Sequence, residues 1–134
     1  MKLSIFGKTS ITVNVQGFRV QQVETRVGER NGEKQWKRTK QFGTSLDDYG
    51  VDVTTDSSGN IYVTGSTEGG LDGNTNSGKG DIFLVKYNSS GTKQWTKQLG
   101  TSLDDWGQDI TTDSSGNIYV TGSTEGGLDG NTNS

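Results

Sequence analysis

The side chains that most often carry out catalysis are absent from this sequence. It contains no histidine and no cysteine, which removes the commonest general base, the commonest metal ligand and every thiol nucleophile. Serine and threonine are plentiful, but without histidine they cannot form a Ser-His-Asp triad. Adjacent carboxylates occur at Asp47-Asp48 and Asp104-Asp105. Because neighbours on a strand point to opposite faces, we expect these residues to cap turns. The residue types therefore predict a protein that is not an enzyme.

An aromatic residue follows each acidic pair, and this arrangement suits binding. An aromatic side chain beside carboxylates is typical of sugar or peptide recognition, and repetition around a ring would turn weak sites into useful avidity. The alternative is that both aromatic rings pack between neighbouring layers of the fold. The candidate binding residues are Asp47, Asp48, Tyr49, Asp104, Asp105 and Trp106.

A second polar cluster has the spacing of metal ligands. Asp72, Asn74 and Asn76 occupy alternate positions, as in the first half of an oxygen-ligand Ca²⁺ loop. The glycine that follows falls one place late, and no glutamate follows at the required spacing. The alternative, which we favour, is a polar loop whose Asn and Asp side chains bond to their own backbone. Ca²⁺ is the one cofactor that the sequence suggests.

Composition limits the class of protein. Hydrophobic residues make up 26% of the 134 residues, and 21 residues are glycine. This apolar content is low for a packed domain. The apolar residues are clustered and mainly β-branched or aromatic, so short strands with Gly-rich turns are favoured over disorder. The net charge of −3 does not fit a nucleic-acid-binding protein, which would carry a basic surface. No apolar run approaches the roughly 20 residues of a membrane helix, and the N-terminus lacks the apolar stretch of a signal peptide.

One long segment occurs twice. Residues 43–77 align with residues 100–134 at a period of 57 residues, and 32 of these 35 positions are identical. Repetition on this scale predicts propeller blades or a stacked array. The three differences are Tyr49/Trp106, Val51/Gln108 and Val53/Ile110.

Turn residues divide each repeat into four short antiparallel strands, which is the pattern of a propeller blade. Helical periodicity is absent. A β-solenoid or a two-sheet sandwich is the alternative. The expected strands, named A to D from the inside outwards, are A at 50–56, B at 60–66, C at 81–87 and D at 93–99, followed by A at 107–113 and B at 117–123.

The stretches GVDVTTDSSGNIYVTGST, DIFLVKYNSSGTKQW and TKQLGTSLDDWG resemble the bacterial β-propeller repeat known as SBBP, and their layout is similar to NHL-type blades. The resemblance covers roughly residues 32–134. It implies an innermost strand near residues 51–56 and an outermost strand near residues 95–99. It also implies a secreted or surface protein, whereas the missing signal peptide favours the opposite, so localisation stays open. Propellers host many unrelated activities, so no particular activity is implied.

The first part of the chain matches the second half of a blade. Residues 34–42 match strand D with two extra residues, Lys37 and Arg38, and residues 23–27 match a degenerate strand C. Residues 22–134 therefore read as two blades in permuted order: C-D, A-B-C-D, A-B. Residues 1–21 read as an N-terminal β-hairpin extension, with 9–15 pairing with 18–22.

Two blades cannot close a ring, because propellers need about four. We expect the A-B half of one copy to pair with the C-D half of the next, a head-to-tail contact that closes. This predicts a trimer or tetramer with six or eight blades, and partners that are further copies or a glycan or peptide, with neither nucleic acid nor membrane. The alternatives are a lectin-like adhesive propeller and a fragment of a longer propeller. The expected oligomer interface residues are Val23, Val27, Trp36, Phe42, Ile118 and Val120.

Overall fold

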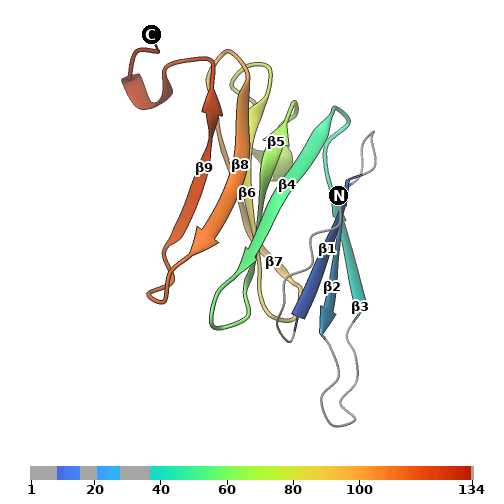
Figure 1. Ribbon diagram of the computed structural model, residues 1–134. Helices are drawn as coiled ribbons and strands as arrows, with labels where there is room; N and C mark the ends of the chain where they lie inside the picture. The colour runs from blue at the N-terminus through green and yellow to red at the C-terminus, as the bar shows by residue number, and fades with distance from the viewer. Residues whose placement is uncertain (1–8, 16–20, 28–36, 134) are drawn as a thin grey trace.

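Three antiparallel sheets are stacked face to face (Figure 1). The computed structural model describes residues 9–15, 21–27 and 37–133, with side chains from residue 40 onward. Within these ranges there is no α-helix. Accordingly, no helix in the described residues is long and apolar enough to cross a membrane. The expected all-β fold with blade-like antiparallel sheets is confirmed. The elements are β1 (Thr9–Val15), β2 (Gln21–Val27), β3 (Lys37–Phe42), β4 (Asp48–Thr55), β5 (Ile61–Thr67), the 3-10 turn η1 (Leu71–Gly73), β6 (Asp81–Tyr87), β7 (Lys93–Leu99), β8 (Asp105–Thr112), β9 (Ile118–Thr124) and the 3-10 turn η2 (Leu128–Gly130).

The middle sheet is a complete blade with the order β4-β5-β6-β7. Its first hairpin turns at Asp56, whose Oδ1 accepts hydrogen bonds from the backbone N–H groups of Ser58 and Asn60, both at 2.9 Å. Gly59 completes the turn with a φ of 78°, which other residues rarely adopt. This turn places β5 antiparallel to β4. The four strands of the sheet lie in sequence order, as predicted for strands A to D.

The last sheet repeats the first half of that blade. In β8–β9, Ile110 lies opposite Val120, as Val53 lies opposite Val63 in β4–β5. Both hairpins carry a bulge at the same place, between Gly107 and Asp109 in the second copy. Among the described residues, no strand pairs with the outer edge of β9.

The first sheet differs from the expectation at its edge. We expected residues 9–15 to pair with residues 18–22, but β1 pairs along its whole length with β2 (Gln21–Val27), and β2 also pairs with β3. Strand β1 therefore lies beside β2 where β5 lies beside β6, and it is antiparallel in both places. The inner edge of the degenerate C strand is occupied within the same chain.

The register of β2 also differs from the sequence match. Gln21 lies opposite Phe42, as Ile82 lies opposite Leu99. Since residues 42 and 99 are one repeat apart, Gln21 rather than Val23 holds the position of Ile82. The slip is two residues, and an even slip keeps every side chain on its expected face, so the alternating pattern could not detect it.

The two pairs of neighbouring sheets are packed in different ways. Between the first and second sheets, the ring of Phe42 meets that of Phe83 edge to face, with centroids 5.6 Å apart. Between the second and third, β8 approaches closely because Gly107 has no side chain: a Cβ there would lie 2.7 Å from Thr64 Oγ1. The buried core between the first two sheets comprises Phe42, Val53, Ile61, Val63, Leu71, Phe83, Val85 and Tyr87.

Candidate functional site

Identical residues in the two copies of the repeat differ in exposure. Tyr62 is 2% exposed and Val63 is fully buried, whereas Tyr119 is 53% exposed and Val120 is 37% exposed. The sequence around them is the same in both copies, so the difference arises from what lies alongside. Two exposed residues, Tyr119 and Val120, and two half-buried ones, Ile118 and Leu128, are here called the β9 surface.

The first copy shows what normally covers this surface. Strand β6 pairs with β5 and places Val85 opposite Val63. The ring of Tyr62 lies 6.3 Å from that of Trp95 on β7, and Lys86 Nζ lies 5.3 Å from the centre of the Tyr62 ring. The cover therefore includes a C-D hairpin in addition to the neighbouring sheets, and no such hairpin lies beside β9 in the described part of the chain.

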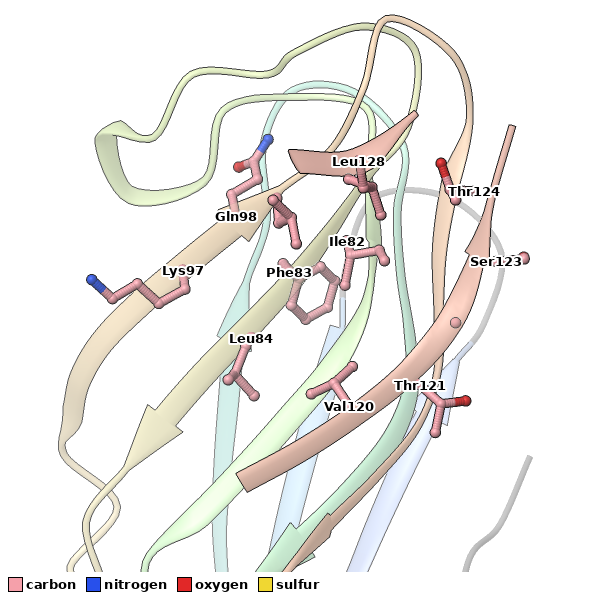
Figure 2. A pocket seen from close by; sticks show the side chains of 12 residues that line it. Ile82, Phe83, Leu84, Lys97, Gln98, Val120, Thr121, Ser123, Thr124 and Leu128 are labelled. Carbon is pink, nitrogen blue, oxygen red and sulfur yellow. The ribbon is translucent and has the colours of Figure 1, made fainter. Parts of the chain in front are cut away.

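A cavity of about 340 Å³ lies where that hairpin would begin. Figure 2 shows Ile82 and Leu84 of β6 on one side of it, and Val120 of β9 and Leu128 of η2 on the other. Leu99, which is 47% exposed, also lines it. Half-buried and exposed apolar side chains gather here, which makes the cavity a candidate interaction site.

The two adjacent carboxylate pairs do not act as pairs. Asp48 is buried, and its Oδ2 accepts a hydrogen bond from the backbone N–H of Thr44 at 2.6 Å. Asp105 is fully buried and accepts the equivalent bond from the N–H of Thr101, also at 2.6 Å. Both residues therefore organise the turn into strand A, and neither is accessible to a ligand.

The aromatic residues beside them are open. Tyr49 is 46% exposed and Trp106 is 39% exposed in the described structure. The Tyr49 hydroxyl donates to Asp47 Oδ2 at 3.4 Å, and the Asp47 carboxylate raises the pKa of Tyr49. Asp104 lies 3.4 Å from Lys79 Nζ. The first loop thus presents an aromatic ring next to a carboxylate, whereas the carboxylate of Asp104 in the second loop pairs with Lys79.

The loop with metal-like spacing is held by its own hydrogen bonds. Asn74 donates from Nδ2 to the carbonyl of Leu71 at 2.7 Å, and Asn76 donates from Nδ2 to the carbonyl of Lys79 at 3.2 Å. Asp72 pairs with Lys93 Nζ at 2.5 Å. Asn76 Oδ1 accepts a hydrogen bond from the backbone N–H of Gly78 at 2.7 Å, and within the described ranges no three acidic side chains gather where a metal ion would fit.

A carboxylate pair that the sequence analysis missed lies between the inner strands. Asp52 and Asp109, one repeat apart, accept from the same donor: the backbone N–H of Ile110 lies 2.9 Å from Asp52 Oδ2 and 2.8 Å from Asp109 Oδ1. Burial raises the pKa of Asp52, and the neighbouring Asp109 side chain raises it further. The signal was the repeat itself, because stacked blades place equivalent residues side by side.

The expected interface residues lie in different environments. Ile118 and Val120 belong to the β9 surface, whereas Phe42 is buried within the chain against Phe83. Val23 and Val27 lie on β2, which already has a strand on both edges. Trp36 lies outside the described residues.

Comparison with known families identifies the repeat. The model of the family described as beta-propeller repeat, SBBP, matches residues 37–72 and again residues 94–129, together more than half of the chain. No curated protein matches the chain. Both matches run from a D strand through the following A and B strands into the η turn, which agrees with the two copies counted in the sequence. The chain therefore belongs to the SBBP family of β-propeller repeats.

Proposed function

We propose that this chain is a non-catalytic assembly module whose last blade joins a further copy of the chain, head to tail, to build a closed propeller. The observation that carries the proposal is the unequal burial of Val63 and Val120, identical residues in identical strands. Because β9 has the same side chains as β5, it can bind a neighbouring strand through the same apolar contacts that bury β5. Burying apolar area of this kind is the main driving force for association.

The backbone supports the head-to-tail order. The outer edge of β9 is unpaired in the described structure, and unpaired edges readily accept another strand. The sheet at the other end, β1-β2-β3, has the strand order of β5-β6-β7 with β1 in the place of a B strand. A neighbouring β9 would replace β1 on β2, and the two half-blades would become one.

This proposal is tested by the native mass of the intact chain and of two deletion variants. The intact chain is expected to form discrete trimers or tetramers in native mass spectrometry and light scattering. Deleting residues 1–16 removes β1 from the edge of β2 and should raise the oligomer fraction. Deleting residues 1–43 also removes β2 and β3 and should abolish it. A folded monomer at every concentration, or an oligomer that survives the longer deletion, would contradict the proposal.

Glycan binding is a second candidate, supported by the exposure of Tyr49 and Trp106 and by the contact of Tyr49 with Asp47. Aromatic faces stack on sugar rings, and adjacent carboxylates accept hydrogen bonds from hydroxyls. A glycan array probed with the purified oligomer tests it. Binding should be lost when both aromatics are changed to alanine, and a blank array would remove this candidate.

A further inference from the structure

The cavity beside β9 has an occupied counterpart one repeat earlier. In the first copy, Phe83 of β6 belongs to one buried cluster with Phe42, Val63 and Leu71. The residues 57 positions after these three neighbours are Leu99, Val120 and Leu128, and all three line the cavity. The place that Phe83 fills between the first two sheets is therefore open between the last two.

We propose that this cavity is a binding site for an aromatic side chain, presented by an extended strand of another SBBP repeat that pairs with β9. The strand has the chemistry of β6, Asp-Ile-Phe-Leu-Val-Lys-Tyr, and arrives as a C-D hairpin. This inference uses the same edge as the proposed assembly, but it does not require that a ring forms.

The strand pairing places the aromatic residue at the cavity. Phe83 lies opposite Gly65 in the β5–β6 ladder, and Gly122, the equivalent of Gly65, lines the cavity. A glycine opposite an aromatic leaves room for the ring to lie across the sheet, and such cross-strand pairs stabilise an edge that glycine weakens. The edge of β9 and the cavity therefore recognise the same residue of the incoming strand.

The chain's own β2 is a poor match for this site. Its register with β3 places Gln22 opposite Gln41, as Phe83 lies opposite Gln98. If the β2 strand of a second copy pairs with β9, Gln22 therefore takes the position beside the cavity that Phe83 takes in the complete blade. We therefore expect a β6-type hairpin to compete successfully with a second copy for β9.

The test uses the full chain and a synthetic peptide of residues 79–99, which contains β6 and β7. Titration calorimetry is expected to show saturable binding of one peptide per chain. The peptide carrying Phe83→Ala should bind about a hundredfold more weakly, because truncation of a buried phenylalanine is among the costliest changes in an apolar site. A peptide carrying Ser89→Ala, in the exposed turn, is the matched control and should bind as the parent does.

Two variants of the chain locate the site. Leu99→Glu puts a charge on the cavity wall and should abolish binding, whereas Leu46→Glu should not alter it. Leu46 is a fair control, since it is 50% exposed against 47% for Leu99 and does not line the cavity. Equal binding of the parent and Phe83→Ala peptides, or full binding to the Leu99→Glu chain, would overturn the inference.

Native mass measured in the same titration separates this inference from the proposed function. Peptide binding to a chain that is monomeric throughout would support the cavity and refute self-assembly. An oligomer that neither binds the peptide nor dissociates with it would support self-assembly and overturn the cavity. Conversion of an oligomer into a one-to-one complex supports both.

Discussion

Val63 and Val120 form a matched pair for measuring what covers the last blade. Changing either to alanine removes two methyl groups, worth about 0.8 kcal/mol each in transfer, and a buried site adds a cavity cost. Val63 is fully buried, so Val63→Ala should lower the free energy of unfolding by about 2–3 kcal/mol at any protein concentration. Val120 is 37% exposed, so Val120→Ala should cost less than about 1 kcal/mol in an isolated chain.

Association changes this expectation for Val120 alone. If a neighbouring strand buries Val120 as β6 buries Val63, the alanine variant loses about 2 kcal/mol per contact, which corresponds to roughly thirtyfold weaker association. Urea unfolding followed by tryptophan fluorescence, at protein concentrations about a hundredfold apart, measures both quantities. The two variants should differ most at low concentration and converge at high concentration.

The reasoning fails in two recognisable ways. A Val120→Ala variant whose stability loss stays small at all concentrations would show that nothing covers the β9 surface. A Val63→Ala variant that costs as little as Val120→Ala would show that the middle blade is not packed as described. Val51→Ala provides a control on the same sheet, because Val51 is 43% exposed and should change stability by less than about 0.5 kcal/mol.

Three further predictions concern other parts of the structure. Because the pKa of Asp52 is raised in the folded state, its protonation favours folding at low pH, and this contribution is lost as pH rises through its folded pKa. Asp52→Asn should therefore raise the urea midpoint at pH 7 more than at pH 4, and a pH-independent change would contradict the raised pKa of Asp52. Gly107→Ala should destabilise by about 1–3 kcal/mol, since its Cβ would collide with β5, whereas Gln108→Ala on the exposed side should be near neutral in thermal unfolding. Excess chelator should leave the melting temperature unchanged if the Asp72 loop is held by its own bonds, and a clear drop would indicate bound Ca²⁺.

The repeat and its strands could be predicted because they depend on local signals. Gly59 and Asp56 define the first hairpin turn through a positive φ and short-range hydrogen bonds, and these residue types are visible in the sequence. The turn roles expected for Asp48 and Asp105 follow from equally local contacts. Long apolar or alternating runs between such turns leave little freedom for other secondary structure.

The placement of the N-terminal strands could not be predicted in the same way. Pairing β1 with β2 along its full length, and shifting β2 by two residues, both preserve the alternation that sequence reasoning uses. The Asp52–Asp109 pair was missed for a related reason, because one repeat separates these residues in sequence and only stacked sheets bring them together.

The sequence by itself determined the all-β class, the 57-residue repeat, the four-strand order of a blade and the absence of histidine and cysteine chemistry. It assigned the same local structure to both copies, and both adopt it. Only the tertiary structure decided that Tyr62 is buried and Tyr119 is open, that β1 occupies the edge of β2, and that a cavity lies between β6 and β9. The physical reason is that turns and strands follow from residues close in sequence, whereas burial is set by whatever lies beside a residue in space.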